Sequence, residues 1–84
     1  MNKKQRLILQ KIFGEPERSD ISWKDIEGLF VALRAEITEG RGSRVRVALN
    51  DIRAVFHRPH PERVTSKGTV KSVRRFLMES GVQF

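Results

Sequence analysis

The most regular pattern in the chain is an alternation of apolar and polar residues over residues 44–49 and again over residues 52–57. A period of two is typical of strands that bury only one face. The residues between the two runs, Asn50 and Asp51, are of the kind that tight hairpin turns favour. The pattern therefore predicts an antiparallel β-hairpin with a two-residue turn.

A two-residue turn fixes the register of this hairpin and divides its side chains between two faces. One face is apolar and consists of Val45, Val47, Leu49, Ile52, Ala54 and Phe56. On the opposite face the register pairs Ala48 with Arg53, Arg46 with Val55 and Arg44 with His57. We therefore expect the apolar face in the core, and the three arginines and the histidine on the other side.

Three other segments place apolar residues three and four positions apart, the spacing of a helix that buries one side. They are residues 3–13, 23–33 and 70–80. The expected N-terminal caps are Asn2, Ser22 and Thr69. A short strand over residues 35–39 is expected before the hairpin.

The resulting order of helix, helix, strand, strand, strand and helix predicts an α+β fold. Helices would cover one face of a three-stranded antiparallel sheet. Without the first helix, this is the order of the double-stranded-RNA-binding-like fold. A chain of 84 residues has room for one modest core, so we expect a single domain over residues 1–84. Residues 1–20 would form an N-terminal helix and loop, and residues 21–84 the α-β-β-β-α core.

The composition excludes several classes of protein. No apolar run approaches the roughly 20 residues that span a bilayer, so we expect no membrane partner. The chain has no cysteine, which excludes disulfides and cysteine-based zinc sites. A reducing, cytoplasmic location suits such a chain.

The basic charge is concentrated in one half of the chain, whose formal net charge is +7. Residues 1–39 contain seven basic and seven acidic residues, whereas residues 40–84 contain ten basic and three acidic ones. Arginine predominates in the basic half, and its planar fork suits phosphate and carboxylate, so the distribution favours a polyanion or an acidic partner. The residues expected to contact RNA are Arg41, Ser43, Arg46, Arg53, Arg58, Lys67, Lys71, Arg74 and Arg75.

Several short motifs accompany these elements. They are Gly42-Ser43 before the hairpin, Pro59-His60 after it, Lys67-Gly68-Thr69 at the last helix, and Phe76-Leu77 and Gly81-Val82 near its end. In this order, over residues 22–82, they resemble the HicA family of toxins. The resemblance implies a small basic ribonuclease that cleaves messenger RNA and is neutralised by a HicB-like antitoxin. The family's usual signature is Gly-Ser-His, with the histidine taken as catalytic. This chain has Arg44 at that position.

The predicted register offers a way to cleave RNA without that histidine. Metal-independent cleavage needs a group that takes the 2′-hydroxyl proton, one that protonates the leaving oxygen, and a cation that stabilises the phosphorane. Because His57 is expected opposite Arg44, we hypothesise that His57 is the base, Arg44 the phosphate clamp and His60 the acid. No cofactor is implied. Two histidines without nearby cysteine or carboxylate make a weak metal site.

Other readings of these residues remain open. His57 also suits a half-exposed strand position, and His60 a turn beside two prolines, without any catalytic role. Arg44 in place of histidine is equally what a catalytically inactive RNA-binding module of the same fold would carry. A DNA-binding regulator that uses the helix over residues 23–33 is disfavoured, because that helix is acidic as well as basic.

Overall fold

Three helices and a three-stranded sheet form the described part of the computed structural model, residues 1–14, 20–59 and 63–83. The elements are α1 (Lys3–Phe13), α2 (Trp23–Ala32), β1 (Glu36–Glu39), β2 (Arg44–Leu49), β3 (Ile52–His57) and α3 (Lys67–Glu79). Their order and pairing confirm the predicted α+β fold. Within these ranges, every helix is too short or too polar to cross a lipid bilayer.

The sheet has the order β1-β2-β3, with antiparallel pairing on both sides of β2. The register expected for the hairpin is confirmed, from Leu49 opposite Ile52 at the turn to Arg44 opposite His57 at the open end. Strand alternation then sends the apolar residues of β2 and β3 to one face and the basic ones to the other.

The hairpin turn is compact and attached to the last helix. Asn50 and Asp51 have φ angles of 50° and 68°, both in the left-handed region that a type I′ turn requires. The side-chain amide of Asn50 donates a hydrogen bond of 2.7 Å to the carbonyl oxygen of Ser80, just beyond α3. The tip of the hairpin is therefore fixed to the C-terminal end of α3.

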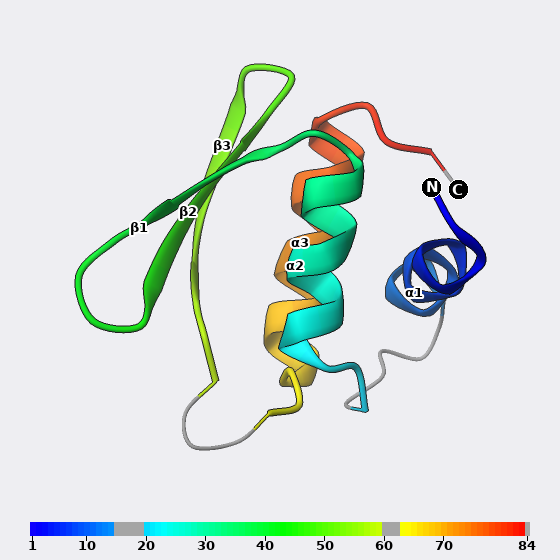
Figure 1. Cartoon of the computed structure of the whole chain (residues 1–84), viewed down its shortest axis with the longest axis horizontal. Coiled ribbons are helices and arrows are strands. Elements are labelled where there is room, and N and C mark those ends of the chain that lie inside the picture. The colour runs from blue at the N-terminus through cyan, green and yellow to red at the C-terminus, as the bar shows by residue number, and fades with distance from the viewer. Residues whose placement is uncertain (15–19, 60–62, 84) are drawn as a thin grey trace.

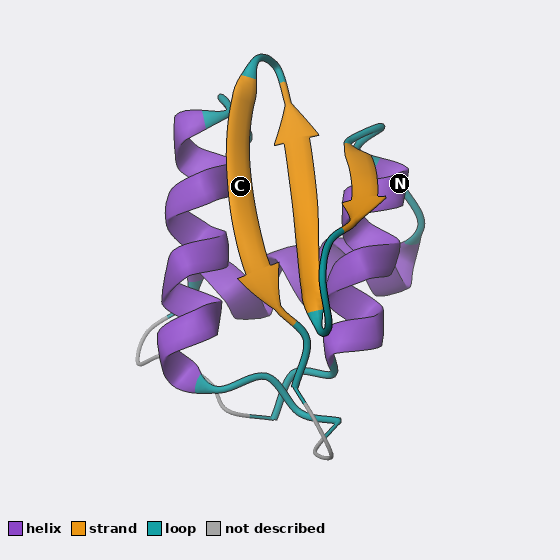
Figure 2. Cartoon of the chain, turned by 90° about the vertical axis from the view of Figure 1, so that its left-hand side faces the viewer, coloured by secondary structure: helices purple, strands orange, loops and turns teal. Residues whose placement is uncertain are grey.

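The elements form three layers (Figure 1). α2 and α3 form the middle layer, with the sheet on one side and α1 on the other. The view onto the sheet shows that no helix of the described chain covers its outer face (Figure 2). The fold thus leaves one whole face of the sheet free for contact with another molecule.

The core between the sheet and the middle layer is centred on an aromatic cluster. Its members come from α2, β3 and α3 and are Trp23, Phe30, Phe56 and Phe76. The contacting rings have centroids 5.8 to 6.3 Å apart, and several pairs meet edge to face, which aromatic rings favour. This cluster joins the three elements, and burial of Val45 and Val47 on β2 extends it across the sheet.

The start of α3 differs from the prediction. The helix begins at Lys67, three residues before the expected position. Thr69 was expected to be the cap, but the cap is Ser66, whose hydroxyl accepts a hydrogen bond from the amide of Thr69 at 3.3 Å. At α1 the expected cap is confirmed, because Asn2 and Gln5 form a reciprocal capping box.

The start of α2 is held by the segment that leads into α3. Ser22 occupies the expected cap position, but its side chain makes no capping hydrogen bond within the described residues. Instead the amide of Trp23 donates to the carbonyl of Arg63 at 3.1 Å, and the amide of Thr65 donates to Ile21 at 2.7 Å. The chain that returns from β3 therefore lies against the entry of α2.

Candidate nucleic-acid interface

The outer face of the sheet carries exposed basic side chains. β2 contributes Arg44 and Arg46, and β3 contributes Arg53 and His57, all of them exposed. β1 adds the acidic residue Glu36, which lies beside β2 on the same face. The positive charge of this face is therefore concentrated over β2 and β3.

Arg44 and His57 lie directly opposite each other at the open end of the hairpin. The amide of Arg58 bonds the carbonyl of Ser43 at 2.9 Å, so 43 and 58 form a hydrogen-bonded pair. The neighbouring pair of Arg44 and His57 is then of the non-hydrogen-bonded type, in which facing side chains are closest. The structure therefore brings together the two side chains that the sequence register juxtaposes.

A tight turn between β1 and β2 holds the backbone of Arg44. Gly40 donates its amide to the carbonyl of Arg44 at 2.9 Å, and the amide of Arg44 donates to Arg41 at 3.1 Å. A Cβ atom on Gly40 would lie 3.0 Å from the Cβ of Arg44, so a side chain at position 40 would have to displace Arg44 by a few tenths of an ångström. Gly42 has a φ of 60°, and Arg41 and Ser43 are exposed beside it. The glycines of this loop therefore position Arg44, a role the sequence pattern did not reveal.

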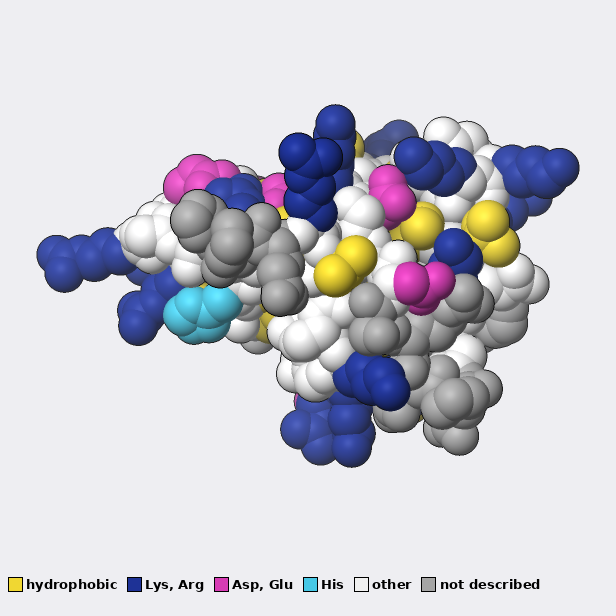
Figure 3. All heavy atoms as spheres, turned by 90° about the horizontal axis from the view of Figure 1, so that it is seen from below, with side chains coloured by type: hydrophobic (Ala, Val, Ile, Leu, Met, Phe, Trp, Pro, Cys, Tyr) yellow, Lys and Arg dark blue, Asp and Glu magenta, His cyan; other side chains and the backbone are white. Residues whose placement is uncertain are grey.

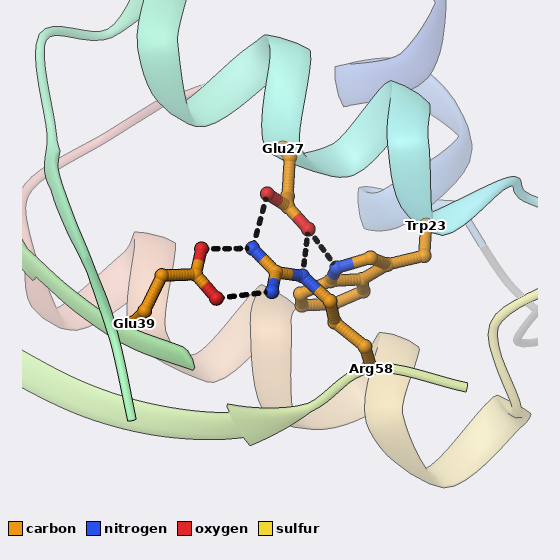
Figure 4. Close-up of polar contacts among 4 residues, drawn as sticks. All are labelled: Trp23, Glu27, Glu39 and Arg58. Carbon is orange, nitrogen blue, oxygen red and sulfur yellow. Dashed lines mark hydrogen bonds and ion pairs between the residues drawn. The ribbon is translucent and has the colours of Figure 1, made fainter. Parts of the chain in front are cut away.

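Arg58 lies in a cluster of charged side chains just after β3 (Figure 4). Its guanidinium donates to both oxygens of Glu27 on α2, at 2.7 and 3.1 Å, and to both oxygens of Glu39 at the end of β1. Trp23 donates its indole N–H to the same Glu27. Arg58 was expected to contact nucleic acid, but both edges of its guanidinium already bind carboxylates of this chain.

The electrostatics of this cluster favour the ion-paired state. The hydrogen bonds from Arg58 hold the pKa of the Glu39 carboxyl below its ordinary value, and the carboxylates raise the pKa of Arg58. Glu39 is largely open to solvent and Glu27 only partly, so water screens the first pair more than the second. The cluster fixes the end of β3 to β1 and α2, one residue after His57.

Arg74 also makes intramolecular contacts. Its Nε donates to the carbonyl of Ile12 at 2.8 Å, and its Nη2 donates to the carbonyl of Gly14 at 3.1 Å. These carbonyls lie at the C-terminal end of α1, where the last backbone C=O groups of a helix have no N–H donor within the helix. The side chain thus attaches α1 to α3, although the sequence placed it among the RNA contacts.

The remaining cations of α3 face the edge of the sheet. Exposed Lys71 and Arg75 line a groove of about 700 Å³ between α3 and β3, together with Arg53. Lys67, also exposed, begins the helix. His60, the expected acid, lies outside the described residues. Basic side chains of the hairpin and of α3 therefore lie next to each other along the groove between β3 and α3.

Basic side chains also line a second hollow on the sheet and are spread over the face of the molecule seen in Figure 3. This second, smaller hollow of about 440 Å³ lies on the outer face of the sheet and is lined in part by Arg46, Arg53 and Thr38. In the view of Figure 3, side chains of lysine and arginine project from the surface at many places and acidic ones at few. Among residues 1–14, 20–59 and 63–83, no cluster of three potential metal ligands occurs.

A comparison with protein families matches most of this chain. The model of the family described as the HicA toxin of bacterial toxin–antitoxin pairs matches residues 23–82. The chain belongs to the HicA toxin family. No curated protein and no solved structure matches it. As a HicA domain, it is the toxin member of a toxin–antitoxin pair.

The HicA match has a clear boundary in the structure. It begins with α2 and includes the sheet, the Gly42-Ser43-Arg44 segment and α3. α1 lies outside the matched residues, on the side of α2 and α3 that faces away from the sheet. The HicA part alone therefore contains the basic face, and α1 adds a further layer behind it.

Proposed function

We propose that this HicA toxin is a metal-independent endoribonuclease that acts on messenger RNA. The observation that carries the proposal is the facing pair of Arg44 and His57 on an exposed basic surface of a HicA domain. The pair combines an imidazole, the side chain most often used as a general base, with a guanidinium that can bind phosphate, and both are exposed.

In the proposed reaction, the imidazole of His57 takes the proton from a ribose 2′-hydroxyl. The 2′-oxygen attacks the adjacent phosphorus, and the bond from phosphorus to the 5′-oxygen of the next nucleotide breaks. Arg44 donates hydrogen bonds to the phosphorane oxygens, where charge develops. The departing 5′-oxygen receives a proton from His60, and the products are a 2′,3′-cyclic phosphate and a 5′-hydroxyl.

The RNA strand would extend from this pair over the outer face and toward α3. Arg46 and Arg53 lie on the same face of the hairpin as Arg44. Lys71 and Arg75 continue the line of cations from Arg53. Arg41 and Ser43 lie just before Arg44 in the loop between β1 and β2, and Lys67 begins α3. We leave Arg58 and Arg74 out of this surface, because their guanidinium groups already bind acceptors of the chain.

The neutralising partner is proposed to be a HicB-like antitoxin, and the proposed site of action is the cytoplasm. A second candidate function is RNA binding without cleavage. The presence of Arg44 at the family's histidine position favours it, because arginine is a poor proton acceptor.

The deciding experiment is RNA cleavage by the purified chain with a metal chelator present. We expect cleavage, and we expect His57→Ala to reduce the rate by about 10²- to 10⁴-fold, the usual contribution of a general base. RNA binding, measured by fluorescence anisotropy, should be retained by His57→Ala. Arg44→Ala should weaken both, whereas the matched control Arg6→Ala on α1 should change neither.

Two results would decide against the enzyme. Equal cleavage by the wild-type chain and His57→Ala removes this histidine from the mechanism. RNA binding by the wild-type chain without any cleavage, even at high protein concentration, establishes the inactive RNA-binding module instead.

A further inference from the structure

The strand β3 lies at the edge of the sheet, and its outer edge has no partner strand within the described residues. In an antiparallel ladder, alternate residues direct their backbone groups toward the partner strand or away from it. The hydrogen bond from Arg58 to Ser43 sets the alternation, so the amides of Arg53, Val55 and His57 point outward. The described residues contain no hydrogen-bond partner for these amides.

This free edge borders the groove between β3 and α3. The groove has a volume of about 700 Å³ and includes two exposed apolar side chains, Val55 on β3 and Met78 on α3. Their exposed fractions are 56% and 59%, which is high for large apolar residues. An open strand edge beside an apolar groove is the arrangement that binds an extended peptide as an additional strand.

The charges along the groove select the kind of segment that fits. Arg53, Lys71 and Arg75 line it, against the single described acidic residue Glu79. Edge strands usually carry charges or prolines that prevent further pairing, whereas β3 has no proline and carries only the basic residues Arg53 and His57. A positively charged segment is therefore repelled, and a segment with acidic side chains is attracted.

We propose that this groove binds an extended, acidic segment of a partner protein, which adds a strand to β3. Backbone hydrogen bonds to the outward edge would hold the segment in register. Its acidic side chains would face Arg53, Lys71 and Arg75, and its apolar ones Val55 and Met78. The proposal rests on the proposed function only in naming the antitoxin as the protein that supplies this segment.

Two other occupants fit less well. A second copy of this chain would bring the same three cations of each groove toward each other, which electrostatic repulsion opposes. A strand of RNA would leave Val55 and Met78 without apolar contacts. An acidic protein strand is the occupant that uses the edge, the apolar side chains and the cations together.

The probe for the test is a blocked peptide of about eight residues in which glutamate and valine alternate, long enough to span a strand of average length. Its binding to the full chain is followed by NMR, as shifts of assigned backbone amides. We expect shifts and slowed hydrogen exchange at Arg53, Val55 and His57, and shifts along the facing side of α3. A peptide with lysine in place of glutamate should bind much more weakly.

Two pairs of substitutions test the electrostatic part. Lys71→Glu with Arg75→Glu reverses the charge of the groove, and Lys3→Glu with Arg6→Glu makes the same change of net charge on α1. We expect the first pair to weaken peptide binding by about tenfold or more, and the second to leave it nearly unchanged. Equal weakening by both pairs would overturn the proposal, since only net charge would then matter.

Val55→Pro tests the edge itself, because it removes one outward amide and leaves the bonds between β2 and β3 intact. We expect weaker peptide binding with unchanged amide shifts in β2. Shifts confined to the outer face around Arg44 and Arg46 would contradict the proposal. So would self-association of the chain through the same amides, or an RNA oligonucleotide that protects these backbone amides as strongly as the peptide does, since RNA is expected to contact only the side chains of Arg53, Lys71 and Arg75.

Discussion

At the scale of single residues, chemically alike side chains have different tasks in this molecule. Arg44 and Arg46 project from the outer face of the sheet and are open to solvent. Arg58 has the same charge and lies one residue after β3, yet its guanidinium binds two carboxylates from α2 and β1. Position relative to Glu27 and Glu39 therefore decides whether an arginine supports the fold or is available to a ligand.

The Glu39 carboxylate predicts a pH dependence of stability. Its pKa in the folded chain is lowered from 4.5 by the hydrogen bonds of Arg58, so the unfolded chain binds the proton more readily. This contribution to stability is present above the ordinary pKa and is lost as the pH falls through the folded value. In urea unfolding from about pH 6 to about pH 3, Glu39→Gln should reduce the fall in the free energy of unfolding.

The matched control for this substitution is Glu36→Gln, which removes an acidic side chain from the outer face of β1. We expect Glu36→Gln to show the same acid dependence as the wild-type chain. A steeper loss of stability at low pH in Glu39→Gln than in the wild type would contradict the assigned direction of the pKa.

The facing of Arg44 and His57 was predictable from sequence, because it follows from a period of two and the length of the turn. The pairing of Arg58 was not. Its partners lie 31 and 19 residues away along the chain, and no local pattern relates them. The same holds for Arg74, whose acceptors are carbonyl groups of α1 that carry no sequence signal.

At the scale of elements, the local sequence pattern predicted the strands of the hairpin more accurately than it predicted the first residue of α3. Two hydroxyl residues three positions apart, Ser66 and Thr69, both suit a helix cap, and the intervening Lys67 and Gly68 have no apolar periodicity. The structure selects Ser66, which adds a turn and brings Lys67 into the helix. The hairpin offered no such choice, because a slip by one residue would bury its arginines.

The contribution of Arg74 to the attachment of α1 can be tested by substitution. Arg74 on α3 bonds the carbonyls of Ile12 and Gly14 at the end of α1. Without these donors, α1 should separate more readily from the middle layer. We expect Arg74→Ala to speed amide hydrogen exchange in α1 by about tenfold while α2 and the sheet change little. Arg75→Ala, the adjacent exposed arginine, is the control and should leave α1 protected.

If Arg74→Ala instead accelerated exchange uniformly over the chain, α1 would unfold only together with the rest. The layer behind the HicA part would then belong to the same cooperative unit. Unchanged exchange in α1 would mean that its buried side chains, among them Ile8, Leu9 and Ile12, hold it without the arginine.

At the scale of the whole molecule, the uneven distribution of charge along the sequence becomes a difference between two sides. Residues 1–39 are neutral overall and supply α1, α2 and β1. The positive half supplies the hairpin and α3. The net charge was readable from composition, whereas the gathering of Arg53, Lys71 and Arg75 along one groove depended on how α3 packs beside β3.

This arrangement predicts how RNA affinity responds to salt. Each phosphate contact releases counterions, and the logarithm of affinity falls with the logarithm of salt concentration by about 0.7 per contact on a single strand. We expect Lys71→Ala with Arg75→Ala to reduce this slope by about 1.4. Lys3→Ala with Arg6→Ala on α1 should leave it unchanged. Anisotropy titrations across a salt series provide the measurement, and equal slopes for both pairs would place RNA elsewhere.

The hairpin is anchored at both of its ends, by Asn50 to the end of α3 and by Arg58 to α2 and β1. Because both ends are fixed, the hairpin is rigid even though no helix of the described chain covers its outer face. A polynucleotide that binds this face must then change its own sugar–phosphate torsions to follow the curvature of the sheet, because the shape of the sheet itself changes little.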